Sequence, residues 1–119
     1  MTTKHTAKQA VAASFALVLL ATTQAHAQVD AASVNWIMPG CREAERGGNS
    51  EGYKQGMCGG VVRGILYASP TVCSPNEVTF GQARAVVVQY LEQRPSRWHE
   101  SFSKLTNEAL SQTWPCRPH

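Results

Sequence analysis

The chain has 119 residues, of which 43% are hydrophobic and 16% charged, and its formal net charge is +3. This length is enough for one small domain with a modest core. The basic residues form no patch or stripe, so neither a nucleic acid nor an anionic membrane surface is expected as a partner.

Residues 1–27 have the organisation of a secretory signal peptide. Lys4 and Lys8 give a basic start, residues 11–21 form an apolar run, and Ala25–His26–Ala27 matches the small-residue cleavage pattern. The run is shorter than the roughly 20 apolar residues of a membrane span, which argues against an uncleaved anchor. We therefore expect an exported chain whose single mature domain covers residues 28–119.

The mature part begins with a weak helical signal. Residues 28–35 are expected to be a frayed lead-in, followed by a short helix or turn that ends at Pro39–Gly40, because this dipeptide is a strong stop. Residues 42–49 are polar and contain glycine. They are predicted to form an exposed loop.

Residues 52–68 are predicted to form a helix with an unusual lane of glycines. Gly52, Gly56, Gly60 and Gly64 recur every four residues, and apolar residues with the same spacing lie between them. Each glycine in a helix costs about 0.5–1 kcal/mol relative to alanine, so we expect a neighbouring helix to pack on the lane. The closest approach is expected at Gly60 and Gly64, which predicts that Gly60→Leu overpacks the contact and destabilises the fold.

Two further helices complete an all-α prediction. Thr79 and Gln82 form a capping box at the start of one helix, which ends before Pro95. The last helix covers residues 101–113. The expected architecture is a small single-domain helical bundle stapled by two disulfides.

The four cysteines all lie in the mature part, which indicates disulfides in an exported chain. Sequence alone leaves three pairings open. If the last two helices are antiparallel, Cys116 comes close to Cys73, and Cys41 is left to pair with Cys58. A zinc site is disfavoured because the spacings contain no C-x-x-C pair, and no metal or cofactor is expected.

Residues suited to catalysis are few. His99 and Glu100 could serve a cysteine nucleophile, but only if a cysteine stays reduced. Glu43 and Glu45 lie in a polar segment typical of a solvated surface, and the glycine-rich stretch is neither a P-loop nor a G-x-G-x-x-G motif. The sequence therefore favours a binding protein over an enzyme.

Several short motifs are similar to those of a known family. They are M-P-G-C at 38–41, C-x-G-V-V-x-G-I at 58–65, C-x-P-x-x-V-T-x-G-Q at 73–82 and W-P-C at 114–116. In this respect the chain resembles the Tai/Rap-type immunity proteins. The resemblance implies a periplasmic, non-enzymatic and often homodimeric protein that plugs the active site of an NlpC/P60-type peptidoglycan amidase toxin delivered by type VI secretion. The alternative is a periplasmic protein-binding or envelope-stress module with the same fold and no toxin partner.

The resemblance does not supply the partner-facing residues, so these are predicted from exposure. Two polar segments follow or contain cysteines and could enter a cleft with little ordering cost. The residues proposed to face the partner are Arg42, Glu43, Glu45, Arg46, Thr71, Ser74, Asn76 and Glu77.

Overall fold

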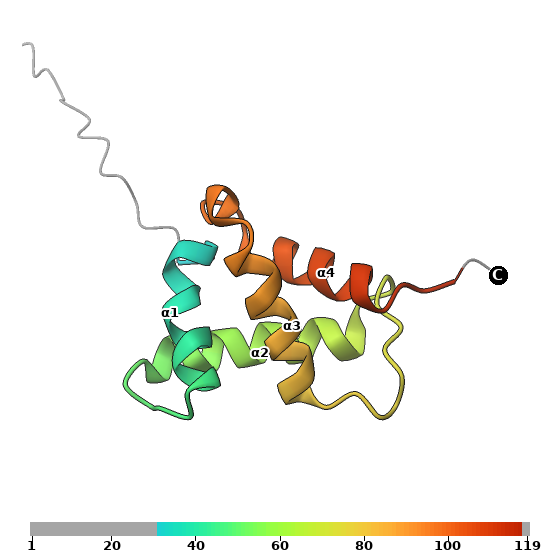
Figure 1. The fold of residues 1–119 in the computed structure, drawn as a ribbon, viewed down its shortest axis with the longest axis horizontal. Coiled ribbons are helices and arrows are strands. Elements are labelled where there is room, and N and C mark those ends of the chain that lie inside the picture. The colour runs from blue at the N-terminus through green and yellow to red at the C-terminus, as the bar shows by residue number, and fades with distance from the viewer. Residues whose placement is uncertain (1–30, 118–119) are drawn as a thin grey trace, which may run out of the picture.

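The computed structural model describes residues 31–117, and the regular secondary structure within this range consists of helices, with two isolated β-bridges in the connecting segments (Figure 1). The elements are α1 (Val34–Glu45), α2 (Gly52–Ala68), α3 (Phe80–Glu92), the 3-10 turn η1 (Pro95–Arg97) and α4 (Phe102–Thr113). The predicted all-α class is confirmed. The predicted signal peptide lies outside the described residues, and inside them no helix has the length and apolarity to cross a bilayer.

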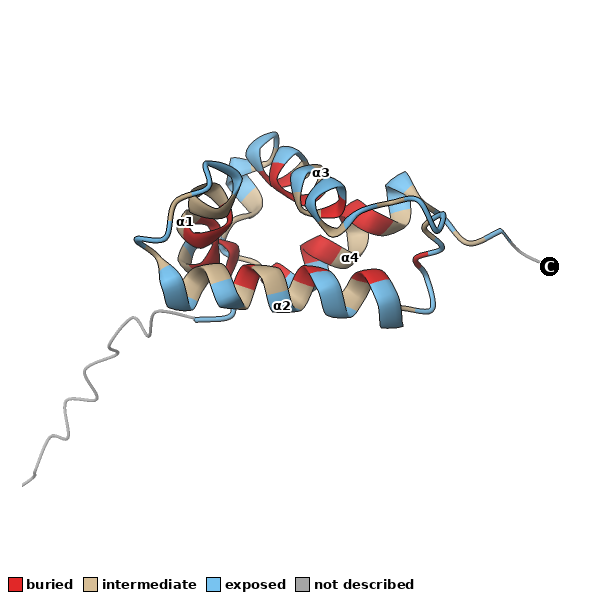
Figure 2. Cartoon of the chain, turned by 90° about the horizontal axis from the view of Figure 1, so that it is seen from below, coloured by how far each residue is buried: buried red, intermediate tan, exposed pale blue. Residues whose placement is uncertain are grey.

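Helix α2 forms one layer of the molecule, and α1, α3 and α4 lie over a single side of it (Figures 1 and 2). Buried positions of α2 face these helices, and its other side is open to solvent. The core draws on each of the α-helices, with the side chains of Val34, Ile37, Met38, Val62, Leu66, Val87, Leu91, Phe102, Leu105 and Leu110.

The start of α1 is held firmly, so the prediction of a frayed lead-in is wrong for the part that the structure describes. The first amide groups of a helix have no partner within it. Here the amide of Val34 donates to the carbonyl of Glu100 at 3.1 Å, and that of Asn35 donates to Trp98 at 2.8 Å. The segment between α3 and α4, residues 93–101, therefore caps α1. We refer to this segment as the bridge.

Helix α1 also continues through Pro39–Gly40, where the sequence predicted a stop. Its actual end is a Schellman motif, in which the amides of Gly47 and Gly48 donate to Ala44 and Glu43, and Gly47 has a φ of 72°. Only the residues after Glu45 form a loop, so the loop predicted over 42–49 begins within the helix.

Gly40 explains why the helix passes this point. A Cβ atom at Gly40 would lie 2.5 Å from the amide nitrogen of Gln55 and from the carbonyl oxygen of Lys54. Gly40 is therefore the place where the backbones of α1 and α2 meet. The next residue, Cys41, is bonded to Cys58 of α2. Close packing and a covalent bond together offset the hydrogen bond that Pro39 cannot donate.

The glycine lane of α2 is not a packing surface within this chain. Gly52, Gly56, Gly60 and Gly64 are all exposed, and a Cβ atom at any of them would meet nothing within 4 Å. The predicted close approach at Gly60 and Gly64 is therefore wrong, as is the expected overpacking by Gly60→Leu. The apolar residues between the glycines supply the buried face instead.

The predictions for α3 and α4 are confirmed. Thr79 accepts a hydrogen bond from the Gln82 amide at 3.1 Å, and the Gln82 side chain accepts one from the Thr79 amide at 2.8 Å. Ser101 caps α4, and the apolar residues Phe102, Leu105, Ala109 and Leu110 of this helix are buried. The antiparallel arrangement of these two helices brings the end of α4 beside the connection that precedes α3.

Candidate functional site

The disulfides are Cys41–Cys58 and Cys73–Cys116, as predicted. The first lies in the core between α1 and α2, with both cysteines fully buried. The second joins the connection between α2 and α3, residues 69–78, to the segment after α4. We refer to residues 69–78 as the connection.

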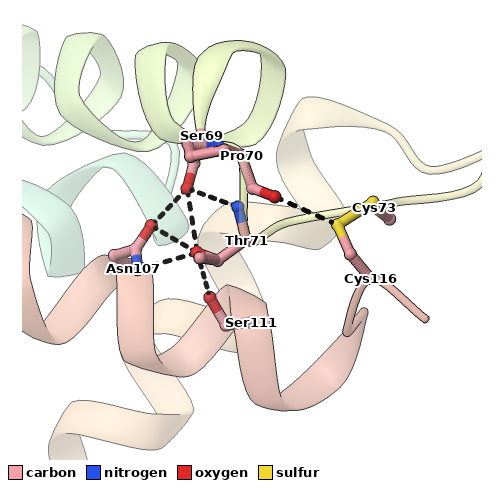
Figure 3. The surroundings of a disulfide bond; sticks show 7 residues. All are labelled: Ser69, Pro70, Thr71, Cys73, Asn107, Ser111 and Cys116. Carbon is pink, nitrogen blue, oxygen red and sulfur yellow. Dashed lines mark hydrogen bonds between the residues drawn. A yellow bond between two sulfur atoms is a disulfide. The ribbon is translucent and has the colours of Figure 1, made fainter. Parts of the chain in front are cut away.

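The beginning of the connection is fastened to α4 by a cluster of small polar side chains (Figure 3). The Ser69 hydroxyl donates to Oδ1 of Asn107 at 2.6 Å, and Nδ2 of Asn107 donates to the Thr71 hydroxyl at 3.0 Å. The Thr71 hydroxyl also lies 2.9 Å from that of Ser111. Thr71, one of the predicted partner-facing residues, is therefore engaged in holding the connection in place.

The middle of the connection, residues 74–77, is not held by polar side-chain contacts of this kind. In the described chain the side chains of Ser74, Asn76 and Glu77 make no hydrogen bond or ion pair, and Asn76 and Glu77 are exposed. A hollow of about 310 Å³ lies between this segment and the end of α2. Tyr67, 69% exposed, is among the residues lining it.

The first predicted set, Arg42, Glu43, Glu45 and Arg46, has a different character. These residues lie at the end of α1 rather than on a protruding loop, and each is already paired. Arg42 bonds Glu92 and lies over the ring of Trp98, Glu45 bonds Arg84, and Glu43 bonds Arg46 at 2.7 Å.

Hydrogen bonds from Arg46 and then Ser50 hold the pKa of Glu43 below its ordinary value. The other three residues of this set, Arg42, Glu45 and Arg46, border a hollow of about 510 Å³ between α1 and α3.

The structure does not bring the two predicted sets together. One lies beside the start of α2 and the other at its end, and a helix of 17 residues is about 25 Å long (Figure 1). A single narrow cleft would therefore engage one set only. The middle of the connection is the better candidate, because the side chains of Ser74, Asn76 and Glu77 have no partner within the described residues to give up on binding.

A charged network surrounds Arg97, and the sequence analysis did not predict it. Its guanidinium bonds Glu100 and also Glu108 of α4, at 2.8 Å to the latter, and Glu108 accepts from the Tyr90 hydroxyl. Arg97 first and Lys104 second lower the pKa of Glu100 to about 2. The spacing of Arg97 and Glu100 fits a turn, but the partner in α4 depends on tertiary structure. The network is structural, since it ties the bridge to α4.

The described residues offer a binding surface rather than a reactive centre. All four cysteines are in disulfides, so the thiol-based alternative has no free thiol to use. His99 is exposed and takes no part in the Arg97 network. No group of His, Cys, Asp and Glu side chains in the described range could hold a metal ion.

These features define a small disulfide-bonded all-α protein. The family model for Rap1a immunity proteins matches residues 33–116, and the chain belongs to this family. No curated protein and no solved structure matches it. Family membership makes the chain an immunity protein whose partner is a protein toxin, and together with the disulfides it indicates an exported protein.

Proposed function

We propose that this protein is a periplasmic immunity protein, released from its signal peptide after Ala27, that inhibits a peptidoglycan amidase toxin. The toxin is of the NlpC/P60 type and is delivered by type VI secretion. Inhibition is steric: the middle of the connection enters the active-site cleft and blocks the substrate. N-terminal sequencing of the periplasmic protein tests the export step, with Gln28 expected as the first residue.

One observation carries the choice of the connection. Its middle presents unengaged polar side chains, while both of its ends are fixed, the first by Asn107 and Cys116 and the second by the Thr79 cap. A segment that is ordered before binding loses little conformational entropy when it enters a cleft. The paired charges at the end of α1 would have to be broken or desolvated instead.

The test measures inhibition of an exported NlpC/P60-type amidase whose gene neighbours the gene of this protein. Ser74, Asn76 and Glu77 are replaced together by alanine, and peptidoglycan hydrolysis is measured against inhibitor concentration. We expect an inhibition constant at least tenfold higher, about 1.4 kcal/mol of lost binding. The matched control replaces the exposed Arg46, Asn49 and Ser50 at the other end of α2.

Full inhibition by the connection variant, or loss of inhibition in the control alone, would contradict the assignment of the connection. If the unaltered protein does not inhibit the amidase at all, the alternative of a periplasmic protein-binding or envelope-stress module is favoured. Circular dichroism of each variant confirms that the fold is retained.

We further propose that the protein is a homodimer, and the open face of α2 supports this. Tyr53 and Tyr67 are 73% and 69% exposed. Apart from Arg63, the exposed positions of α2 form pairs of similar residues at equal distances on either side of Gly60: Tyr53 with Tyr67, Gly56 with Gly64 and Gly52 with Ala68. A second α2 crossing antiparallel at Gly60 would therefore meet a surface complementary to itself.

Analytical ultracentrifugation tests the dimer. Gly60→Leu should raise the dissociation constant at least tenfold, because the added side chain separates the two backbones. The same side chain introduced at the exposed Ala85 of α3 is the control and should leave dimerisation unchanged. A protein that remains monomeric at high concentration would rule out the proposal.

A further inference from the structure

The two disulfides lie in opposite environments. Cys41 and Cys58 have no exposed surface, and a reagent can reach them only if α1 and α2 separate. Cys73 is exposed and Cys116 half-buried, and their bond joins two segments that lie outside the helices. A thiol in solution can therefore reach the second disulfide in the folded protein. Exposed disulfides are typically the more easily reduced ones.

Opening Cys73–Cys116 would leave the main packing contacts in place. The core is built by helical side chains together with Val72 of the connection, and the contact between α1 and α2 keeps its own disulfide. The start of the connection keeps its hydrogen bonds to Asn107, and α3 keeps its cap.

The middle of the connection, in contrast, would lose its only covalent tie. It would keep a hydrogen bond from the Cys73 amide to Trp114 and one from the Val78 amide to Pro75. Val72 remains packed in the core, so the effect of reduction is concentrated on residues 73–78, which contain the residues assigned above to the partner.

We propose that Cys73–Cys116 is a site of thiol–disulfide exchange, recognised by a protein carrying a reactive dithiol, and that its reduction releases the connection without unfolding the domain. The effect on inhibition rests on the proposed function, but the exchange itself does not. A thiolate of the dithiol attacks one sulfur, the Cys73–Cys116 bond breaks, and a mixed disulfide forms. The second thiolate then displaces the protein, so the dithiol is oxidised to a disulfide and two protein thiols are formed after protonation.

The surroundings of the bond indicate which sulfur is attacked. Cys73 is the more exposed residue, so the mixed disulfide should form on Cys73 and Cys116 should be the leaving thiolate. The sulfur of Cys116 lies 3.4 Å from the carbonyl oxygen of Pro70 (Figure 3). A disulfide sulfur has no hydrogen to donate, but the Cys116 thiol formed by reduction could donate to this oxygen and would thereby be held in place.

The first experiment uses the folded, oxidised protein with dithiothreitol as the probe. Samples are quenched, alkylated and digested, and mass spectrometry follows the labelling of each cysteine over time. We expect Cys73 and Cys116 to be labelled at least a hundredfold faster than Cys41 and Cys58, while the helical circular dichroism signal is unchanged. Equal rates, or labelling that coincides with loss of helicity, would overturn the proposal.

Two further measurements test the local effect and the direction of attack. Hydrogen exchange in the selectively reduced protein should accelerate at least tenfold in residues 73–78 and remain unchanged in α1 and α2. With glutathione, which has one thiol, the mixed disulfide should be found on Cys73. Glutathione mainly on Cys116, or unchanged exchange in the connection, would contradict the proposal.

The last measurement links the exchange to partner binding. The selectively reduced protein and the Cys73→Ser/Cys116→Ser variant should inhibit the amidase at least tenfold more weakly than the oxidised protein. If the oxidised protein inhibits and reduction changes nothing, this inference fails and the proposed function stands. If the oxidised protein does not inhibit, the proposed function fails, and the labelling experiment still decides whether exchange occurs.

Discussion

At Gly40 the sequence predicts the end of a helix, whereas in the structure the helix continues. Next to Pro39 it reads as a helix stop, yet in the folded protein its missing Cβ allows α1 to touch the backbone of α2. The actual stop is Gly47–Gly48, where the motif was visible in the sequence. A proline followed by glycine predicts chain reversal only when no tertiary contact needs the glycine.

Gly40→Ala should destabilise the protein by about 1–3 kcal/mol, because the added methyl group overlaps backbone atoms that cannot move independently. Thermal or urea unfolding measures the change. If the variant is as stable as the unaltered protein, α1 and α2 do not meet at this residue.

Thr106 is fully buried in α4, and its hydroxyl has no hydrogen-bond partner in the described part of the chain. Thr106→Val keeps the shape and removes the unsatisfied group, so it should stabilise the fold by about 1 kcal/mol. The reverse change in the core, Val87→Thr, is the control and should destabilise. A loss of stability in Thr106→Val would mean that the hydroxyl has a partner.

Among the elements, α2 was predicted most accurately in extent and least accurately in orientation. Its apolar periodicity fixed the helix, and Ser69–Pro70 fixed its end. The predicted packing of a helix on the glycine lane was wrong, because the apolar positions and the glycine positions both recur every four residues and the glycines were placed on the packed side. Glycine lowers the stability of a helix whether it faces the core or the solvent, so this conformational cost did not indicate which side of α2 is buried.

Gly60→Ala should therefore stabilise the monomer by about 0.5–1 kcal/mol, since the position is open and helical and alanine restricts the unfolded chain. Unfolding is measured at a concentration low enough to avoid self-association. Together with Gly40→Ala this gives the same substitution in two helices with opposite expected signs. Destabilisation at Gly60 would place the lane against another part of the chain.

At the scale of the whole molecule, charge pairs act both within one segment and between distant ones: Arg42–Glu92 and Glu45–Arg84 tie α1 to α3. Glu43, Glu100 and Glu108 all have lowered pKa values because arginines donate to them, Arg46 to the first and Arg97 to the other two. A carboxylate with a lowered pKa in the folded state contributes stability above its unfolded pKa. The contribution disappears as the pH falls through the folded value.

The stability contributed by Glu100 should accordingly be complete above its ordinary pKa of 4.5 and vanish as the pH approaches about 2. At pH 7 Glu100→Gln should lower the melting temperature, and near pH 2 the two proteins should melt alike. Calorimetry across this range makes the comparison. A difference in melting temperature that is independent of pH would assign the effect to packing rather than to charge.

The sequence predicted local features well and contacts between distant segments unevenly. The Thr79 cap, the extents of α2 to α4 and both disulfides followed from short motifs and a simple topology. The pairing of Arg97 with Glu108 and the capping of α1 by the bridge required three-dimensional proximity that no local pattern encodes. For the site, exposure suggested both polar sets, and only the structure distinguished paired from free side chains.

The burial of Cys41–Cys58 also has a consequence for the order in which a newly exported chain matures. Once the core has closed, an oxidant can no longer reach these two sulfurs, so their bond has to form while the chain is still open. The short separation of 17 residues favours early encounter. The helical hairpin of α1 and α2 is then the first part of the fold to be fixed by a disulfide. Cys73 and Cys116 remain accessible to an oxidant after folding, so their bond can form last.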